Sequence, residues 1–302
     1  MRTFLNHLWR VVVASFVLYI VWIISMIISE HIIPSGLKTV EGKEALSAAL
    51  LYTVCLTHVL VLYIMICHIQ WRGFKLVLVV FSLIYFIQFL LSMVETIWFN
   101  ASLEMPASGI KNIIFSGLLL SAIFSPLFVW ISGKFRRTPE FILAKINWND
   151  IFSGTFLIKM FVLIVVIYPM LYNLAGYYIA WQFEAVRLFY TGSTDMEPFG
   201  SMLLANIKSG LYPFQILRGF IWLILALPVY YLSEGSYKKK GVIIGLLFAT
   251  LMNAQHILPN PYFPSEVSFA HFVETYSSNF LWGYCIAWIL NWHQGRKLSV
   301  AE

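Results

Sequence analysis

The stretch LWRVVVASFVLYIVWIISMII, from Leu8 to Ile28, contains a single charged side chain, Arg10. A helix needs about 20 mostly apolar residues to cross the hydrocarbon core of a bilayer, so this stretch predicts a membrane-spanning helix. The whole chain has the same character, because 60% of its 302 residues are hydrophobic and only 11% are charged. An ordinary soluble domain has about 25% charged residues. The composition therefore excludes a soluble globular protein and predicts an all-α, polytopic membrane protein.

Further apolar stretches of similar length follow along the chain, and the polar connections between them are short. We therefore expect one membrane-embedded helical domain over residues 1–302. In the seventh and shortest stretch, Gly241 and Gly245 have the spacing that lets a second helix approach closely, which indicates helix packing. About eight spans are predicted, near residues 8–28, 45–69, 74–99, 111–132, 151–181, 211–233, 241–258 and 268–292.

The basic residues predict the orientation of these spans. Thirteen of the 20 Lys and Arg residues flank one set of span ends and five flank the other. Basic residues are retained on the cytoplasmic side, so both termini are predicted to be cytoplasmic. We expect membrane lipid around the chain and, from the lack of longer targeting signals, a location in the inner (plasma) membrane of the cell. The net charge of +6 is spread over short loops, so no nucleic-acid partner is expected.

Polar side chains inside the late spans indicate a site. Ionisable groups are costly within a membrane and usually have a function there. In the last span His271, Glu274 and Ser278 are spaced i, i+3, i+7 and share one face of the helix. His256 lies just before Pro259, which ends the seventh span. These residues predict a polar pocket in the outer half of spans six to eight.

The residue types in this pocket suggest two kinds of chemistry. His256, His271 and Glu274 are the candidate catalytic residues, either as acid and base groups or as ligands of zinc or iron. Arg218, in the sixth span, is expected to hold an anionic headgroup or carboxylate of the substrate. The other substrate-binding candidates are Gln215, Asn253, Ser278, Glu184, Arg187 and Glu95.

Glu95 is a candidate because of a short recurring string. Val94-Glu95-Thr96 in the third span recurs as Val273-Glu274-Thr275 in the eighth, and both copies fall at the outer membrane face. Between spans five and six, residues 182–210 begin with an apolar stripe at helical spacing that ends at Gly192. This segment is expected to be a lid over the site or an interfacial rim.

Three functions fit these features. The leading hypothesis is a membrane-embedded enzyme that carries out hydrolysis or group transfer on a lipid-linked or membrane peptide substrate. The first alternative is a transporter or channel for a small polar or anionic cargo, although polarity is confined to one side of the membrane. The second is a structural or assembly subunit, in which a buried pair of Arg218 and Glu274 would only fix helix packing.

Overall fold

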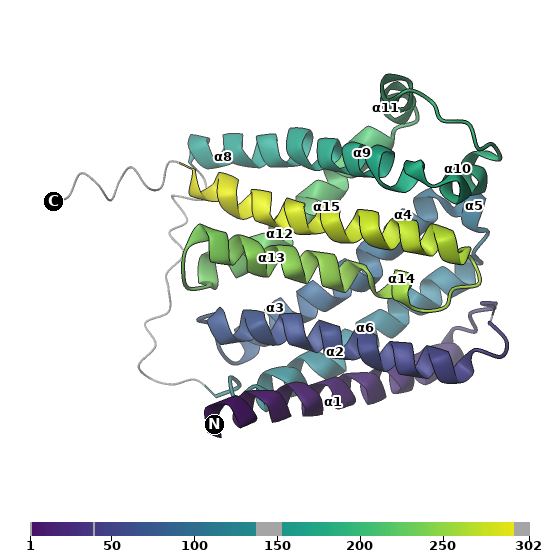
Figure 1. Ribbon diagram of the computed structural model, residues 1–302. Coiled ribbons are helices and arrows are strands. Elements are labelled where there is room, and N and C mark those ends of the chain that lie inside the picture. The colour runs from purple at the N-terminus through teal and green to yellow at the C-terminus, as the bar shows by residue number, and fades with distance from the viewer. Residues whose placement is uncertain (1, 39, 137–152, 293–302) are drawn as a thin grey trace.

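The computed structural model describes residues 2–38, 40–136 and 153–292, which fold into a bundle of helices (Figure 1). Long helical segments run along the bundle in alternating directions. As a result, the start of α1 (Arg2–Ile32) and the end of α15 (Ser265–Asn291) lie at the same end of the bundle (Figure 1). At that end, Ile69 and Ser233 form an isolated antiparallel bridge. The fold class predicted from composition, an all-α membrane-type protein, is confirmed for the described residues.

The remaining elements follow in chain order. The first half of the chain contains α2 (Glu44–His68), α3 (Phe74–Ser82), the π-helical η1 (Leu83–Leu91), α4 (Ser92–Trp98), α5 (Asn100–Leu103) and α6 (Ala107–Ile131). The second half contains α8 (Gly154–Phe161), the π-helical η2 (Val162–Ile167), α9 (Tyr168–Tyr178), η3 (Ala180–Gln182), α10 (Glu184–Thr191), α11 (Phe199–Lys208), α12 (Leu211–Leu232), α13 (Tyr237–Met252) and α14 (Ala254–Ile257).

Within the part of the chain that the structure describes, six helical segments are long and apolar enough to cross a membrane. They match the first six predicted spans, although the fifth begins at Gly154 and residues 151 and 152 lie outside the described part of the chain. The predicted seventh and eighth spans do not qualify. The reason for α13 is its length of 16 residues, and the reason for α15 is the polar side chains that it carries, including His271 and Glu274. The six segments are Leu5–Ile32, Glu44–His68, Phe74–Trp98, Ala107–Ile131, Gly154–Gln182 and Leu211–Leu232.

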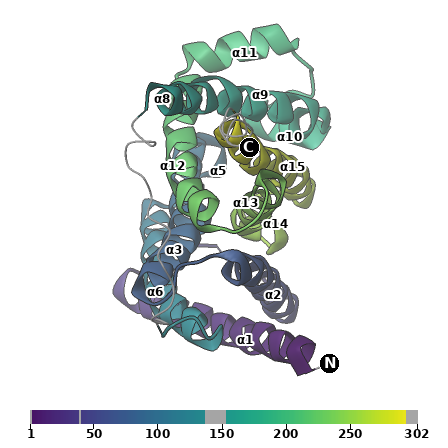
Figure 2. The same ribbon diagram turned by 90° about the vertical axis from the view of Figure 1, so that its left-hand side faces the viewer.

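Both exceptions lie side by side (Figure 2), and α15 exposes one apolar face that includes Phe269 and Leu281. Almost every residue of α13 from Gly241 to Met252 is buried or half-buried, so this helix presents little apolar surface to lipid. A Cβ atom added to Gly283 of α15 would lie 2.5 Å from the backbone nitrogen of Gly245. Backbone therefore meets backbone where these helices pack, and the prediction that Gly241 and Gly245 permit close helix packing is confirmed.

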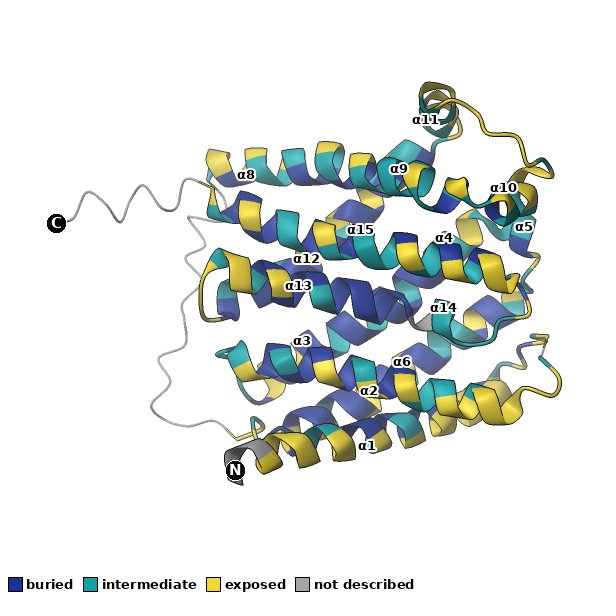
Figure 3. Ribbon diagram, viewed as in Figure 1, coloured by how far each residue is buried: buried dark blue, intermediate teal, exposed yellow. Residues whose placement is uncertain are grey.

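The exposed surface of the bundle is apolar, as a lipid-facing surface requires. In α1 the side chains of Phe16 and Ile27 are exposed, while Ala14 and Leu18 on the other face are buried (Figure 3). The same contrast recurs in α12, where Leu217 is exposed and Leu223 is buried. The helices thus bury one apolar face against each other and present a second apolar face to the surroundings.

Two π-helical segments lead directly into the polar end of the bundle. η1 continues into α4, which carries Glu95, and η2 continues into α9, which carries Tyr168 and Tyr172. A π-helical turn rotates the residues that follow it relative to a regular helix and is frequent at functional sites. These two segments set the direction in which α4 and α9 present their side chains.

Candidate active site

A cavity of about 360 Å³ lies at the end of the bundle opposite to the start of α1. Its walls come from α4, α9, α10, α12, α14 and α15, and α11 contributes one edge. The volume is in the range of sites that bind a single small ligand. The lining includes both ionisable and apolar side chains. The polar lining residues are Ser92, Glu95, Thr96, Ser102, Tyr168, Tyr172, Asn173, Trp181, Tyr190, Thr191, Asn206, Arg218, His256, His271, Glu274, Thr275, Ser278, Asn279 and Trp282.

Arg218 and Glu95 form a two-pronged ion pair across the cavity wall. Arg218 donates from Nη1 and Nη2 to the two carboxylate oxygens of Glu95, each at 2.7 Å, and from Nη1 to Gln215 Oε1 at 3.0 Å. The Arg218 side chain is 4% exposed and that of Glu95 is 25% exposed. The sequence-based alternative paired Arg218 with Glu274 instead. In the structure Glu95 takes that place, so the pair joins the third predicted span to the sixth.

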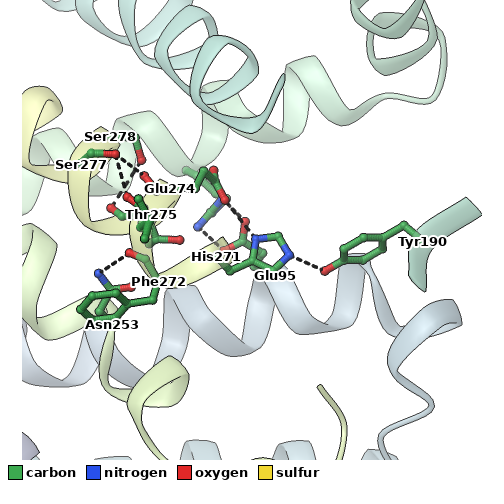
Figure 4. Close-up of polar contacts among 11 residues, drawn as sticks. Glu95, Tyr190, Asn253, His271, Phe272, Glu274, Thr275, Ser277 and Ser278 are labelled. Atoms are coloured by element: carbon green, nitrogen blue, oxygen red, sulfur yellow. Dashed lines mark hydrogen bonds and ion pairs between the residues drawn. The ribbon is translucent and has the colours of Figure 1, made fainter. Parts of the chain in front are cut away.

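His271 lies at the centre of a second polar chain (Figure 4). Its Nδ1 is 3.0 Å from Glu274 Oε2, one turn along α15, and its Nε2 is 3.1 Å from the hydroxyl oxygen of Tyr190. Since Glu274 accepts a hydrogen bond when ionised, it favours the tautomer in which Nδ1 carries the proton and Nε2 accepts from Tyr190. This arrangement orients the imidazole as a base, because the lone pair of Nε2 accepts the hydrogen bond from the phenol of Tyr190.

Burial raises the pKa of Tyr190, and the nearby carboxylates of Glu95 and Glu274 raise the pKa further. The phenol therefore remains protonated over the physiological pH range and can donate to His271 Nε2. In the sequence, Tyr190 belongs only to the apolar stripe that ends at Gly192. The signal that could have identified Tyr190 is its hydroxyl group, because a polar group on the apolar face of a helix usually has a partner. That face of α10 lines the cavity through Val186 and Tyr190.

His256, on α14, lies beside His271. The two rings are 5.9 Å apart between centroids and 28° from parallel. Over the described residues, no group of three or more His, Cys, Asp or Glu side chains has the arrangement of a metal site. The structure thus places the two histidines and Glu274 in one cavity wall.

The other predicted binding residues divide into two groups. Ser278 lines the cavity, one turn beyond Glu274. Gln215 and Asn253 are fully buried next to it, where Gln215 supports Arg218 and Asn253 donates to the carbonyl oxygen of Phe272 at 3.4 Å (Figure 4). Gln215 and Asn253 therefore support residues of the cavity wall and do not line the cavity themselves.

Glu184 and Arg187 lie away from the cavity lining that the structure describes. Glu184 is exposed at the start of α10, and Arg187 donates to the carbonyl oxygens of Trp181 and Thr194. Arg187 therefore ties the α10 segment to the loop that follows it. Neither of these two substrate-binding candidates lines the cavity, although Arg187 is bonded to Trp181, which does.

The recurring string did indicate a shared location. Glu95 and Thr96 of the first copy and Glu274 and Thr275 of the second all line the cavity. Tyr172 also lines it, and its ring lies 6.0 Å from the Arg218 guanidinium, within the range of a cation–π contact. Sequence analysis missed Tyr172 because a tyrosine near the end of a span is typical of the interfacial aromatic belt.

Comparison with protein-family models finds no match, and neither curated proteins nor solved structures include a significant match to this chain.

Proposed function

We propose that this chain is a membrane-embedded enzyme that acts from the non-cytoplasmic side on a substrate in the lipid phase. In this proposal α13 with α14 and α15 are the seventh and eighth passages through the inner (plasma) membrane, and both termini are cytoplasmic. The start of α1 and the end of α15 lie at one end of the bundle, which supports an even number of passages (Figure 1). The polar cavity at the opposite end would then open away from the cytoplasm.

The observation that carries the enzyme proposal is the chain from Glu274 through His271 to Tyr190 in a cavity wall. A carboxylate that orients an imidazole, which in turn accepts from a hydroxyl, is an arrangement suited to general acid–base catalysis. In this mechanism a water molecule or an acceptor hydroxyl gives its proton to the Tyr190 oxygen while Tyr190 gives its own proton to His271 Nε2. The oxygen of the deprotonated water or acceptor hydroxyl then bonds to the electrophilic atom of the substrate.

The proton relay then runs in the reverse direction to complete the reaction. As the bond to the leaving group breaks, the protonated His271 returns the proton through Tyr190 to the leaving group. Glu274 stabilises the imidazolium that forms in between. The overall reaction is hydrolysis when water attacks and group transfer when another hydroxyl attacks.

Arg218 has a different role in this proposal from the one that its residue type indicated. Its two terminal nitrogens are already bonded to Glu95, so we assign it the role of positioning Glu95 and fixing α12 against α4. The cavity then contains two carboxylates and one guanidinium. With neutral histidines its net charge is negative, which disfavours an anionic substrate group.

The proposal uses no metal ion, because both nitrogens of His271 already have protein partners. Zinc or iron at His256, His271 and Glu274 is a competing prediction. Metal analysis of the purified protein tests it. Stoichiometric zinc or iron that disappears in His256→Ala would contradict the metal-free mechanism.

A transport pathway is less well supported. Such a pathway would have to continue from the cavity towards the other end of the bundle. Along that direction Trp282, Trp222 and Phe248 are at most 1% exposed, and Trp222 and Phe248 pack with ring centroids 4.4 Å apart. These large side chains close the floor of the cavity, as expected for a site that binds and releases its substrate on one side.

The test compares membranes that contain the wild-type protein, Glu274→Gln or His271→Gln, and follows lipids and peptides by mass spectrometry. We expect a product of the wild type to fall by about 10²-fold or more in both variants, the range typical of a general acid–base group. The matched control is His68→Gln, at the opposite end of the bundle, where Nδ1 lies 2.8 Å from the carbonyl oxygen of Ile64.

One outcome would contradict the proposed mechanism, and two would contradict the enzyme proposal itself. Unchanged turnover in a folded Glu274→Gln protein would remove the catalytic role of the carboxylate. Loss of cargo uptake into liposomes, without any chemical product, would favour transport. A large fall in thermal stability for every site variant, with no product from the wild type, would favour a structural network.

A further inference from the structure

The segment between α10 and α12 places one helix outside the bundle. α11 is viewed along its axis in Figure 1 and from the side in Figure 2, while the long helices show the reverse, so α11 lies across the bundle axis. None of its residues is buried. A helix in this orientation at one end of a membrane bundle lies in the plane of the interface.

The two faces of α11 have different neighbours. Met202 and Asn206, spaced i and i+4, line the cavity. Leu204 and Ile207 point to the opposite side and are 51% and 49% exposed. Large apolar side chains that remain uncovered on an interfacial helix are the residues that enter the acyl region of a bilayer. α11 therefore lies between lipid and the cavity.

Aromatic residues hold the start of α11 at this level. The rings of Tyr177 and Phe199 are in edge contact with centroids 5.2 Å apart, and Tyr177 donates to the carbonyl oxygen of Glu197 at 3.0 Å. Tyr178 beside them is 59% exposed. Tyrosine side chains with an apolar ring and a polar tip prefer the membrane interface.

A side-chain hydrogen bond joins α11 to α9, and open space lies next to it. Asn206 donates to Asn173 Oδ1 at 2.8 Å, a side-chain bond that joins the two helices. One turn from Asn173, Gly176 lines the cavity, and a Cβ atom added there would have no neighbour within 4 Å. A glycine with open space around it leaves room for a substrate chain to pass between α9 and α11.

The cavity itself is amphiphilic. Glu95, Arg218, His271 and Glu274 form its charged wall, and Leu171 and Met202 belong to its apolar wall. The guanidinium is already neutralised by Glu95, so no uncompensated cation is available for a phosphate or carboxylate. A substrate with an uncharged polar group and a hydrocarbon chain fits both walls.

A peptide substrate fits less well. Peptides are recognised through strand addition to a sheet edge or through a groove that accepts a helix. The part of the chain that the structure describes lines the cavity with helices and short loops and offers no sheet edge there. The backbone groups of an extended peptide would remain unpaired in this environment.

We infer that the substrate is a lipid with an uncharged polar group, such as a hydroxyl or an ester, and that it enters sideways from the outer leaflet between α9 and α11. This inference rests on the proposed function, because it names the substrate class for the same cavity. The open space at Gly176 is the passage, and the bond between Asn173 and Asn206 lies beside it.

The test uses full-length protein in phosphatidylcholine nanodiscs with a photoactivatable diacylglycerol whose reactive group lies midway along one acyl chain. A phosphatidic acid probe with the same chains serves as the anionic comparison. We expect diacylglycerol to label the peptides that contain Leu171 and Met202 several-fold more strongly than phosphatidic acid does. Both probes should label the exposed face of α1 around Ile27 equally.

Two matched variants test the passage. Gly176→Leu puts a side chain into the open space and improves helix propensity, so the protein should fold while cavity labelling by diacylglycerol falls to background. Gly200→Leu makes the same change on α11, also with no neighbour within 4 Å, but away from the cavity lining. It should leave the labelling unchanged.

The inference is overturned if phosphatidic acid labels the cavity as strongly as diacylglycerol does, or if Gly176→Leu leaves cavity labelling intact. Turnover of a hydrophobic peptide without labelling of the cavity by lipid would assign a peptide substrate instead. Glu274→Gln separates the two proposals, because it should retain labelling. Labelling with turnover that does not depend on Glu274 overturns the proposed chemistry alone, and Glu274-dependent turnover without labelling overturns the lipid assignment alone.

Discussion

The guanidinium of Arg218 is bonded to both carboxylate oxygens of Glu95 and to the amide oxygen of Gln215. At the scale of the residue, these contacts decide the energetics of the site. Removing one member of such a buried pair leaves the other charge without compensation in a low-dielectric region. The loss exceeds the net stabilisation by the intact pair, because the desolvation of both charges already offsets much of their attraction.

A double-mutant cycle on this pair checks that reasoning. Glu95→Leu and Arg218→Met should each lower the free energy of unfolding by about 3–5 kcal/mol, and the double variant should recover about 1–3 kcal/mol of the summed loss. Denaturant titration of protein in detergent micelles measures all four states. The control combines Glu95→Leu with Arg187→Met, which lies away from the cavity and should be additive within about 0.5 kcal/mol. Full additivity at Arg218 would contradict a direct pair.

Tyr190 gives a pH prediction. Burial raises the pKa of this phenol, and the folded protein therefore keeps the proton that His271 Nε2 accepts. The difference in tyrosinate absorbance between wild type and Tyr190→Phe should show no contribution from this residue up to about pH 10, where a free tyrosine is half ionised. In unfolded protein the same difference should appear near about pH 10. Ionisation of Tyr190 in the folded protein below that pH would remove it as the proton donor.

At the scale of the element, α13 and α15 depend on glycine. A Cβ atom at Gly283 would approach the backbone nitrogen of Gly245 to 2.5 Å, and a backbone atom cannot move aside as the end of a flexible side chain can. These two helices carry His271, Glu274 and, through α14, His256. The separation of the helices therefore also sets the geometry of the site.

Gly283→Leu should lower the free energy of unfolding by about 3 kcal/mol or more, because the helices must separate to admit the side chain. Gly176→Ala in α9 is the matched control, since no atom lies within 4 Å of its added Cβ. It should change stability by about 1 kcal/mol or less, in the stabilising direction expected for alanine in a helix. Equal stability of the two variants would show that the α13 and α15 backbones are not in close contact.

For the whole molecule, the number of helices that cross the membrane depends on α13 and α15. α13 and α15 are too short or too polar to qualify by themselves, yet they lie among the six apolar segments. The short α13 is surrounded by protein rather than lipid, while the polar side chains of α15 face the cavity and its exposed residues, such as Phe269 and Leu281, are apolar. We therefore expect both to cross with their neighbours.

Cysteine labelling tests this expectation. In a cysteine-free background, Ser265→Cys at the start of α15 should react with a membrane-impermeant maleimide from the outside of intact cells. Glu234→Cys, in the exposed connection between α12 and α13, should react only after permeabilisation. The native cysteines Cys55, Cys67 and Cys285 are free thiols in the structure, so their replacement breaks no disulfide. Reaction of both positions from the same side would mean that α13 does not cross.

The helical membrane fold, the first six apolar segments and the close approach at Gly245 could be predicted from the amino-acid sequence, because hydrophobic length and residue size act locally. The sequence also indicated that His256, His271 and Glu274 lie together, since two of them are one turn apart and a proline-rich turn joins them to the third. Two contacts became evident only from the three-dimensional arrangement: Glu95, more than a hundred residues away in sequence, is the partner of Arg218, and Tyr190 donates to His271. Such contacts depend on which helices are neighbours and on how π-helical turns rotate their faces, and neither is encoded in the spacing of a single segment.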